Sequence, residues 1–170
     1  MTLCKIIHAV LRPPVAAPLT ALGGMAIMAA VWIFQYGFGY APCPLCLTQR
    51  LPWLAAIALG LGAWACWRPA PRLTRLLLAA AGLGLLGGAA VGAYHAGVEW
   101  RWWPGPSSCS GAAPLPADLE ALKQALLAAR PVRCDEIPWS LFGLSMAGYN
   151  SLLSLCAGLY ALAAAWKGKA

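Results

Sequence analysis

Four long stretches without a charged side chain constrain the fold of this chain more than any other feature. They cover 13–49, 51–67, 76–98 and 137–166. Each is close to or longer than the roughly 20 residues that an α-helix needs to cross a bilayer. Apolar residues make up 61% of the chain and charged residues 10%, which is far from the composition of a soluble globular domain. The sequence therefore predicts an all-α membrane protein with a four-transmembrane-helix bundle.

The 170 residues are expected to form a single integral membrane domain, because the chain has room for only one. The expected membrane-spanning helices are, in chain order, 16–38, 47–67, 74–95 and 141–165. The first should be retained and not cleaved as a signal peptide, because its apolar stretch exceeds the roughly 7–15 residues of a signal core. Glycines suggest close packing of the third helix, and they are Gly82, Gly84, Gly87 and Gly88.

Positive and negative charges occupy different segments of the chain. Basic residues without acidic neighbours lie in the N-terminal segment, the second connection and the C-terminal segment: Lys5, Arg12, Arg68, Arg72, Arg75, Lys167 and Lys169. By the positive-inside rule these segments are cytoplasmic, so the connections 39–46 and 96–140 lie outside. All five acidic residues fall in the longer outer connection. The net charge of +7 is thus mainly an orientation signal and does not indicate nucleic acid binding.

The seven cysteines fall into two groups once this topology is considered. Cys4 and Cys66 lie on the cytoplasmic side and Cys156 lies within the fourth helix, where stable disulfides are not expected. The remaining four lie on the outer, oxidising side, and they are Cys43, Cys46, Cys109 and Cys134. Four outer cysteines are the number that two pairs require.

Cys43 and Cys46 form a C-x-x-C motif just before the second helix. Such a motif can serve redox chemistry, zinc binding or haem attachment. Leu47 stands where c-type haem attachment needs histidine, and Cys109 and Cys134 are too far apart to supply the second close pair of a zinc site. Dithiol exchange is therefore favoured, with a four-cysteine zinc site and inert structural disulfides as the alternatives.

The start of the second helix favours a reactive thiol. Pro44 suits the first helical position, so Cys43 is the expected N-cap and Cys46 lies in the first turn, near the positive end of the helix dipole. Thiolates are stabilised in such a position. Arg50 follows Cys46 by four residues, which predicts that it shares a helical face with both cysteines. Its alternative role is to extend toward the membrane surface as an ordinary interfacial arginine.

The outer end of the third helix and the long outer connection carry further polar features. His95 closes the third helix, where a lone histidine is most often an interfacial residue. The charged and aromatic stretch 99–103 is expected to anchor the loop at headgroup level. The segment 116–130 has leucines on one stripe and polar residues opposite, which predicts a short amphipathic helix on the membrane surface.

Together these features resemble the disulfide bond formation protein B (DsbB) family over nearly the whole chain. The shared pattern is four spans, a C-x-x-C motif before the second, an arginine four residues later, and another cysteine pair between the third and fourth spans. Three short segments also resemble the family: Tyr-His-Ala-Gly-Val-Glu at 94–99, Gly-Pro-Ser-Ser-Cys at 105–109 and Gly-Leu-Ser-Met-Ala-Gly-Tyr-Asn at 143–150.

The resemblance implies a membrane protein-dithiol:quinone oxidoreductase that reoxidises a periplasmic thioredoxin-fold oxidase of the DsbA type. The partner would attack a Cys109–Cys134 disulfide and become linked to Cys109, after which Cys134 attacks Cys43. Cys46 would then be released as a thiolate facing the quinone ring. Two electrons would pass on as the Cys43–Cys46 disulfide forms again.

The resemblance further implies that Arg50 and His95 bind the quinone. Ubiquinone is the expected acceptor, with menaquinone as the choice under low oxygen. The protein would cross the bacterial inner (cytoplasmic) membrane several times, with both termini cytoplasmic and the redox loops periplasmic. Its partner would be either a general DsbA or a dedicated oxidase of the same type.

The residues alone leave another function open, namely a non-enzymatic scaffold or small transporter whose outer disulfides only hold loops together. A transporter is expected to carry polar groups or broken helices near the bilayer midplane. Asn150 and Ser154 are the candidates in the fourth helix, and small polar residues there more often mediate helix packing.

The charge distribution makes a direct prediction about topology. Reporter fusions after Lys169 and within 110–115 should give opposite signals, cytoplasmic for the first and periplasmic for the second. A periplasmic signal from the C-terminal fusion would overturn both the topology and the sorting of the cysteines.

Overall fold

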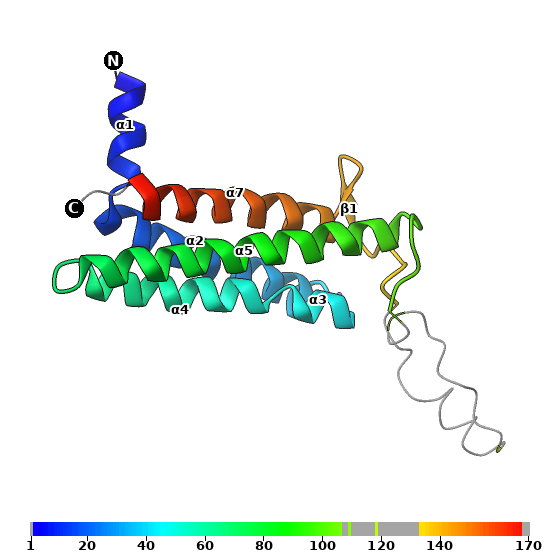
Figure 1. Ribbon diagram of the computed structural model, residues 1–170. Helices are drawn as coiled ribbons and strands as arrows, with labels where there is room; N and C mark the ends of the chain where they lie inside the picture. The colour runs from blue at the N-terminus through cyan, green and yellow to red at the C-terminus, as the bar shows by residue number, and fades with distance from the viewer. Residues whose placement is uncertain (1, 107–108, 110–117, 119–132, 168–170) are drawn as a thin grey trace.

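A computed structural model describes residues 2–106, 109, 118 and 133–167. Within these residues four helices are long and apolar enough to cross a membrane, which confirms the predicted four-helix membrane bundle (Figure 1). The spans are Pro13–Gly37, Pro44–Cys66, Pro71–Glu99 and Met146–Lys167. Helices suit this environment because they satisfy their backbone hydrogen bonds internally.

The spans are built from several elements, and three of the described helices begin at a proline. A short helix, α1 (Thr2–Val10), projects away from the bundle in Figure 1. The remaining elements are, in chain order, α2 (Pro13–Trp32), the π-helical turn η1 (Ile33–Gly37), α3 (Pro44–Thr48), α4 (Leu51–Cys66), α5 (Pro71–Glu99), β1 (Ser140–Leu141), β2 (Leu144–Ser145) and α7 (Met146–Lys167). Proline is favoured at the start of a helix because its missing N–H would have no intrahelical partner there.

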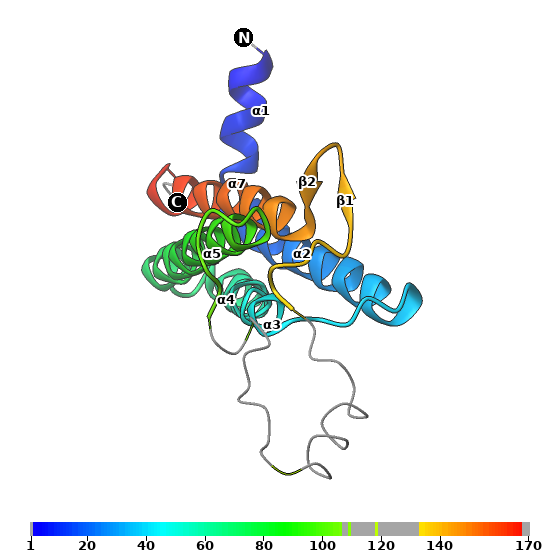
Figure 2. The ribbon, with the colours of Figure 1, turned by 90° about the vertical axis from the view of Figure 1, so that its right-hand side faces the viewer.

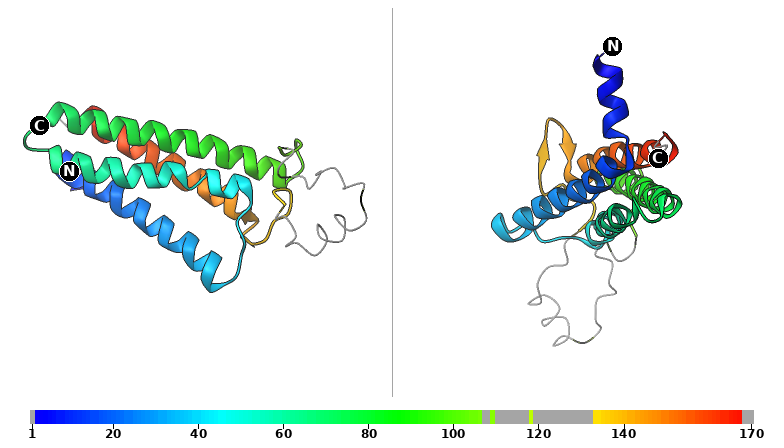
Figure 3. Two further views of the ribbon diagram at one scale, coloured as in Figure 1. Left: turned by 90° about the horizontal axis from the view of Figure 1, so that it is seen from below. Right: turned by 90° about the vertical axis from the view of Figure 1, so that its left-hand side faces the viewer.

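Small residues allow the helices to approach one another closely. Helix α5 packs along both α4 and α7, and α2 packs along α4 (Figure 3). A Cβ atom added at Gly60 of α4 would lie 2.9 Å from the backbone nitrogen of Ala21 in α2. A Cβ added at Gly82 of α5 would lie 2.9 Å from the carbonyl oxygen of Gly158 in α7. Such backbone contact is the usual basis of helix association in lipid.

Two of the four glycines expected to mediate packing of the third helix do so. Gly82 contacts α7, and an added Cβ at Gly88 would lie 2.9 Å from the Pro52 ring of α4. An added Cβ at Gly84 or Gly87 would meet no other atom within 4 Å, so the prediction is wrong for these two. The helix turns by about 100° per residue, so a run of nearby glycines cannot all face the two neighbouring helices.

The ends of the third and fourth helices differ from the predicted ones. Helix α5 continues to Glu99, one turn beyond the expected end at residue 95. Helix α7 begins at Met146, because β1 and β2 form an antiparallel hairpin over the preceding residues. Gly143, in the turn of this hairpin, has a φ of +80°, which glycine adopts without steric strain. The amphipathic helix expected at 116–130 lies outside the described residues.

The second span is also less regular than predicted. Helix α3 ends at Thr48, and α4 begins at Leu51 with Arg50 as its N-cap. Figure 2 views the end of the bundle that carries α3, the last turns of α5 and the hairpin. This end carries the C-x-x-C motif, and the short connection between α4 and α5 lies at the opposite end (Figure 1).

Helix packing predicts unequal effects for two glycines of the same helix. Gly82→Leu should lower the free energy of unfolding of the detergent-solubilised protein by about 1–3 kcal/mol, because the leucine side chain would overlap α7. Gly84→Leu is the matched control, because an added Cβ there meets no other atom within 4 Å. Equal losses of stability in the two variants would contradict this packing.

Candidate redox site

The C-x-x-C motif begins helix α3 as the sequence predicts. Cys43 is the N-cap residue, Pro44 follows at the first helical position, and the Cys43 sulfur accepts the backbone N–H of Cys46 at 3.2 Å. The two sulfur atoms lie 2.8 Å apart, and both cysteines are free thiols. Only a small side-chain movement would therefore join them as a disulfide.

The surroundings of Cys43 favour its thiolate form. The neighbouring Cys46 side chain makes the largest contribution, and with His95 and the Cys46 backbone N–H it lowers the pKa of Cys43 to about 4. Burial acts in the opposite direction, because it disfavours a charged sulfur. Hydrogen bonds to the sulfur outweigh that penalty, which is the usual cause of a reactive cysteine at a helix start.

Helix α5 brings two buried polar side chains to the thiol pair. His95 and Glu99 are only 3% and 6% exposed, and the extra turn of α5 sets them on one helical face. The His95 Nε2 atom lies 3.7 Å from the Cys43 sulfur and 4.0 Å from the Glu99 Oε1 atom. Ser145 of β2 donates a hydrogen bond to the Glu99 carboxylate. His95 and Glu99 are thus buried residues of the site, and Glu99 packs inside the protein where an exposed loop anchor was expected.

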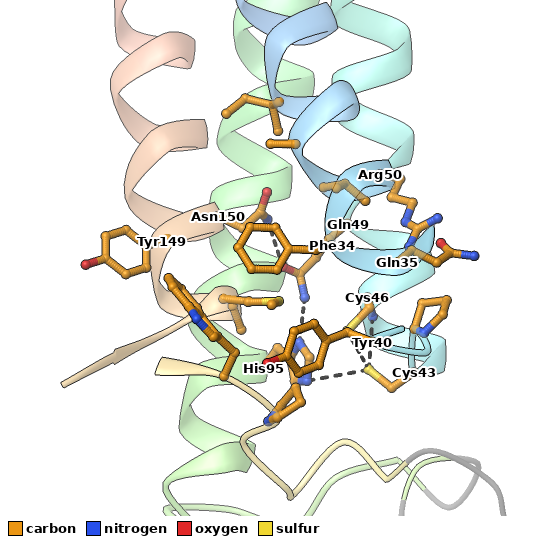
Figure 4. A pocket seen from close by; sticks show the side chains of 18 of the residues that line it. Phe34, Gln35, Tyr40, Cys43, Cys46, Gln49, Arg50, His95, Tyr149 and Asn150 are labelled. Carbon is orange, nitrogen blue, oxygen red and sulfur yellow. Dashed lines mark hydrogen bonds between the residues drawn. The ribbon is translucent and has the colours of Figure 1, made fainter. Parts of the chain in front are cut away.

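A chain of side-chain hydrogen bonds holds the other nitrogen of His95. The Gln49 amide nitrogen lies 2.7 Å from His95 Nδ1, and the Gln49 amide oxygen accepts from Asn150 at 2.7 Å (Figure 4). Trp53 in turn donates to the Asn150 amide oxygen at 2.8 Å. Sequence analysis missed Gln49 and Trp53 and treated Asn150 as a packing residue. The only sequence signal for this hydrogen-bond chain was the presence of polar residues in otherwise apolar helices.

Arg50 reaches the site by a different route from the one predicted. It does not share one continuous helix with the cysteines, because α3 ends before it and α4 begins after it. It nevertheless lines the same cavity as Cys43, Cys46 and His95 (Figure 4). The structure therefore places both residues that were expected to bind quinone on the cavity beside the thiol pair.

The cavity beside the thiols has a volume of about 320 Å³. Its walls are mostly apolar side chains from α2, α4 and α7, among them Ile27, Met28, Val31, Trp53 and Leu153. The turn η1 adds Phe34 and Gln35, and the buried Gln35 Oε1 atom has no hydrogen-bond partner among the described residues. An apolar cavity with a few polar groups fits a flat ring that carries oxygen atoms, and the unpaired amide oxygen can accept a hydrogen bond from such a ring only when the ring bears a hydroxyl.

The second predicted cysteine pair forms a disulfide next to the first pair. Cys109 and Cys134 are bonded, with their Cα atoms 5.1 Å apart. They are buried in one cluster with Cys43 and Val98, and Cys46 packs against that cluster. The structure thus gathers the four cysteines expected to react. The other cysteines whose side chains are described, Cys66 and Cys156, are free thiols.

Three side chains of the site are also spaced as metal ligands. The ligand atoms of Cys43, Cys46 and His95 all lie within 4.8 Å of one another. Cys109 and Cys134 offer no thiolates to such a site while they are bonded to each other. The four-cysteine zinc site considered above therefore does not match this arrangement.

The chain has four helices that are long and apolar enough to cross a membrane, and at one end of them a thiol pair packs against a disulfide. These features are those of a multi-pass membrane protein that carries out thiol–disulfide exchange. A family model described as Disulfide bond formation protein DsbB matches residues 14–164. The chain belongs to this family, and its role is that of a disulfide-forming oxidoreductase.

Individual relatives agree with the family model. Disulfide bond formation protein B 2 of Pseudomonas aeruginosa is 33% identical over 141 residues, covering 80% of each chain. Disulfide bond formation protein B 2 of Pseudomonas syringae is 32% identical over 148 residues, covering 79% of this chain and 77% of the relative. Disulfide bond formation protein B of Methylococcus capsulatus is 29% identical over 151 residues, covering 85% and 88%. No solved structure matches the chain.

The lowered pKa of Cys43 predicts a thiolate in the reduced protein at neutral pH. A depressed pKa means that the charged form is present above that pKa and is lost as the pH falls through it, here at about 4. The measurement is the ultraviolet thiolate absorbance during acid titration. The signal should disappear in Cys43→Ser and persist in Cys156→Ser. A thiolate signal that arises only in alkaline solution would contradict the prediction.

Proposed function

We propose that this protein reoxidises a periplasmic thioredoxin-fold oxidase of the DsbA type and passes the electrons to a membrane quinone. One observation carries the proposal: the Cys109–Cys134 disulfide and Cys43 share a buried cluster, with Cys46 packed against it. Two pairs in contact can exchange a disulfide. The Cys43–Cys46 pair also lines an apolar cavity that a lipid-soluble electron acceptor can enter.

The first exchange takes place at the Cys109–Cys134 disulfide, the loop disulfide. A thiolate of the partner attacks Cys109, the Cys109–Cys134 bond breaks, and Cys134 leaves as a thiolate with the electron pair. Cys134 then attacks Cys43 in its disulfide with Cys46, and Cys46 leaves as a thiolate. The second thiol of the partner attacks the mixed disulfide, so the partner departs oxidised and Cys109 is freed.

The second exchange returns the loop pair to its starting state. Cys109 attacks Cys134, their bond forms again, and Cys43 leaves as a thiolate. The Cys43–Cys46 pair now holds the two electrons of the partner, and its disulfide re-forms when two electrons and two protons leave it. A bound quinone would supply the two-electron acceptor that thiols lack. Ubiquinone is the proposed quinone, with menaquinone as the choice under low oxygen.

Arg50 and His95 are the residues proposed to hold the quinone. Both line the cavity beside the thiols; the Arg50 guanidinium can donate hydrogen bonds to ring oxygens, and the His95 imidazole forms part of the cavity wall next to Cys43. Gln35 is a further candidate, because its buried amide oxygen has no partner among the described residues. That oxygen would accept a hydrogen bond from the hydroxyl of a reduced ring.

A comparison of reduction potentials supports an electron acceptor that is not another thiol. A DsbA-type oxidase has a potential near −120 mV, and every ~30 mV in a two-electron couple corresponds to about 1.4 kcal/mol. Glutathione pools are poised at roughly −180 mV or below, so they cannot take electrons from such a partner. A more oxidising carrier dissolved in the membrane can take them, which suits a thiol pair beside an apolar cavity.

The distribution of charge supports a location in the bacterial inner membrane with the cysteines facing the periplasm. Arg68, Arg72 and Arg75 lie around the connection between α4 and α5, at the end opposite to the thiol pair. Basic segments of this kind stay on the cytoplasmic side. Both chain termini are then cytoplasmic, and the exchange with the partner takes place in the oxidising compartment.

The proposed reaction can be measured with purified components. The protein in lipid is mixed with a reduced DsbA-type oxidase and a soluble ubiquinone analogue, and the ultraviolet absorbance of the oxidised ring is followed. Catalytic loss of that absorbance, dependent on the partner, is the expected result. A partner that stays reduced in the presence of excess quinone would contradict the proposal.

The two-pair relay predicts which cysteines are required. Turnover should be abolished by serine at any of Cys43, Cys46, Cys109 and Cys134. Joint replacement of the other three by serine or alanine should leave turnover intact, and these are Cys4, Cys66 and Cys156. Cys134→Ser should also trap the partner on Cys109, because the resolving thiol is gone. The relay would be wrong if the joint variant were inactive and the four single variants active.

A quinone-binding role of Arg50 predicts a kinetic effect even for lysine. Arg50→Lys keeps the charge and loses the planar set of donors, so the quinone KM should rise, tenfold for each ~1.4 kcal/mol of binding lost. First-turnover exchange with the partner should stay near normal in Arg50→Lys and Arg50→Ala. Arg101→Ala serves as the control, because Arg101 is an exposed arginine near the same end. An unchanged quinone dependence would remove Arg50 from the site.

A further inference from the structure

The hydrogen-bond chain that ends on His95 has a direction that its first member dictates. The indole N–H of Trp53 is only a donor, so the atom of Asn150 that faces it at 2.8 Å must be the amide oxygen. The amide nitrogen of Asn150 then faces Gln49 at 2.7 Å and can only donate. The Gln49 atom at that contact is therefore its amide oxygen.

The same logic continues to the imidazole ring. With its oxygen engaged by Asn150, Gln49 presents its amide nitrogen to His95 Nδ1 at 2.7 Å. An amide nitrogen donates and does not accept, so Nδ1 must be the unprotonated nitrogen of the ring. The neutral imidazole then carries its hydrogen on Nε2. A hydrogen on Nδ1 would instead point at the N–H group of Gln49.

We propose that Trp53, acting through Asn150 and Gln49, sets the tautomer of His95 so that the Nε2 hydrogen faces the Cys43 sulfur and Glu99. The three residues are positioning residues, because they act on the thiol only through the imidazole. Trp53 is 3% exposed and packs with Met28 and Leu85, so the origin of the chain is itself held in place. The inference rests on the proposed function for its role in turnover, but not for the tautomer itself.

The orientation of His95 matters because Cys43 alternates between bonded and ionised states in the proposed relay. When Cys43 leaves as a thiolate, the Nε2–H group, whose nitrogen lies 3.7 Å from the sulfur in this structure, can move closer and stabilise the charge. The opposite tautomer would present a lone pair to that charge and repel it. The Oε1 atom of Glu99, whose carboxylate accepts from Ser145, lies 4.0 Å from the same Nε2 atom.

The assigned tautomer also disfavours binding of a metal ion by the group formed by Cys43, Cys46 and His95. A metal would have to bind the Nε2 atom, because Nδ1 is engaged by Gln49. Metals bind the unprotonated nitrogen of imidazole, and this chain of hydrogen bonds keeps the hydrogen on Nε2. The spacing that resembles a metal site therefore belongs to a thiol pair with a hydrogen-bond donor.

Nitrogen NMR of isotopically labelled histidine tests the tautomer directly. The chain has two histidines, so a His8→Gln background leaves His95 as the single signal. In the reduced, lipid-embedded protein the spectrum should show a protonated Nε2 and an unprotonated Nδ1, in about tenfold excess over the other neutral tautomer. A protonated Nδ1 in this protein would overturn the proposal.

Variants of the chain then test its direction. Trp53→Phe keeps an aromatic side chain and removes the indole N–H, so the excess of the wild-type tautomer should fall toward parity. Trp64→Phe is the control, because Trp64 lies on the same helix with 51% exposure, and it should leave the spectrum unchanged. An unaltered tautomer ratio in Trp53→Phe would contradict the assigned origin.

Asn150→Asp provides a sharper test of nearly the same side-chain size. An ionised aspartate accepts from Trp53 and also accepts from Gln49, so the Gln49 amide must turn over and offer its oxygen to His95. A protonated carboxyl would donate to Gln49 and keep the wild-type arrangement, so the spectrum is recorded as the pH is raised until infrared spectroscopy shows the introduced carboxyl to be ionised. The predominant tautomer should therefore invert to a protonated Nδ1. Retention of the wild-type tautomer in Asn150→Asp after its carboxyl has ionised would overturn the proposal even if Trp53→Phe failed to fold.

Activity assays keep the two proposals apart. If the protein did not reduce quinone but gave the expected spectra, the proposed function would fail and the tautomer assignment would stand. If it reduced quinone and the wild-type spectrum showed a protonated Nδ1, only the present inference would fail.

Discussion

The sulfur atom of Cys43 is the point on which the site depends, because three parts of the fold meet there. Helix α3 supplies the Cys46 backbone N–H, α5 supplies His95, and the buried cluster supplies the Cys109–Cys134 disulfide. A buried thiolate is costly unless donors surround it. Much of the architecture at this end of the bundle serves to hold those donors in place.

Close helix packing makes that arrangement possible. An added Cβ at Gly92 of α5 would lie 2.9 Å from the Ser151 nitrogen of α7, so the two helices touch beside the site. Ser151 donates to the Ala89 carbonyl of α5 at 2.8 Å, which fixes their register. With α5 and α7 held together, Asn150 can reach Gln49 and the hairpin can bring Ser145 to Glu99. Side chains held on rigid elements keep a reactive geometry better than side chains on loops.

Local signals predicted the helices and the thiol pair, because charge-free runs and a proline after Cys43 act within a few residues. Contacts between distant residues were not predictable in this way. Glu99 and Ser145 are separated by 46 residues, and Trp53 and Asn150 by 97. Neither pair carries a spacing that a single sequence reveals. The grouping of Arg50 with the thiols was expected, although the break between α3 and α4 was not.

The central claim is that the Cys43–Cys46 pair couples the loop disulfide to an acceptor in the membrane. Its most direct measurement is the redox state of this pair in membrane vesicles depleted of quinone, determined by thiol alkylation and mass spectrometry. With a reduced DsbA-type partner present, the account predicts that the pair accumulates as thiols and becomes a disulfide when quinone is restored. A pair whose redox state does not respond to quinone would contradict it.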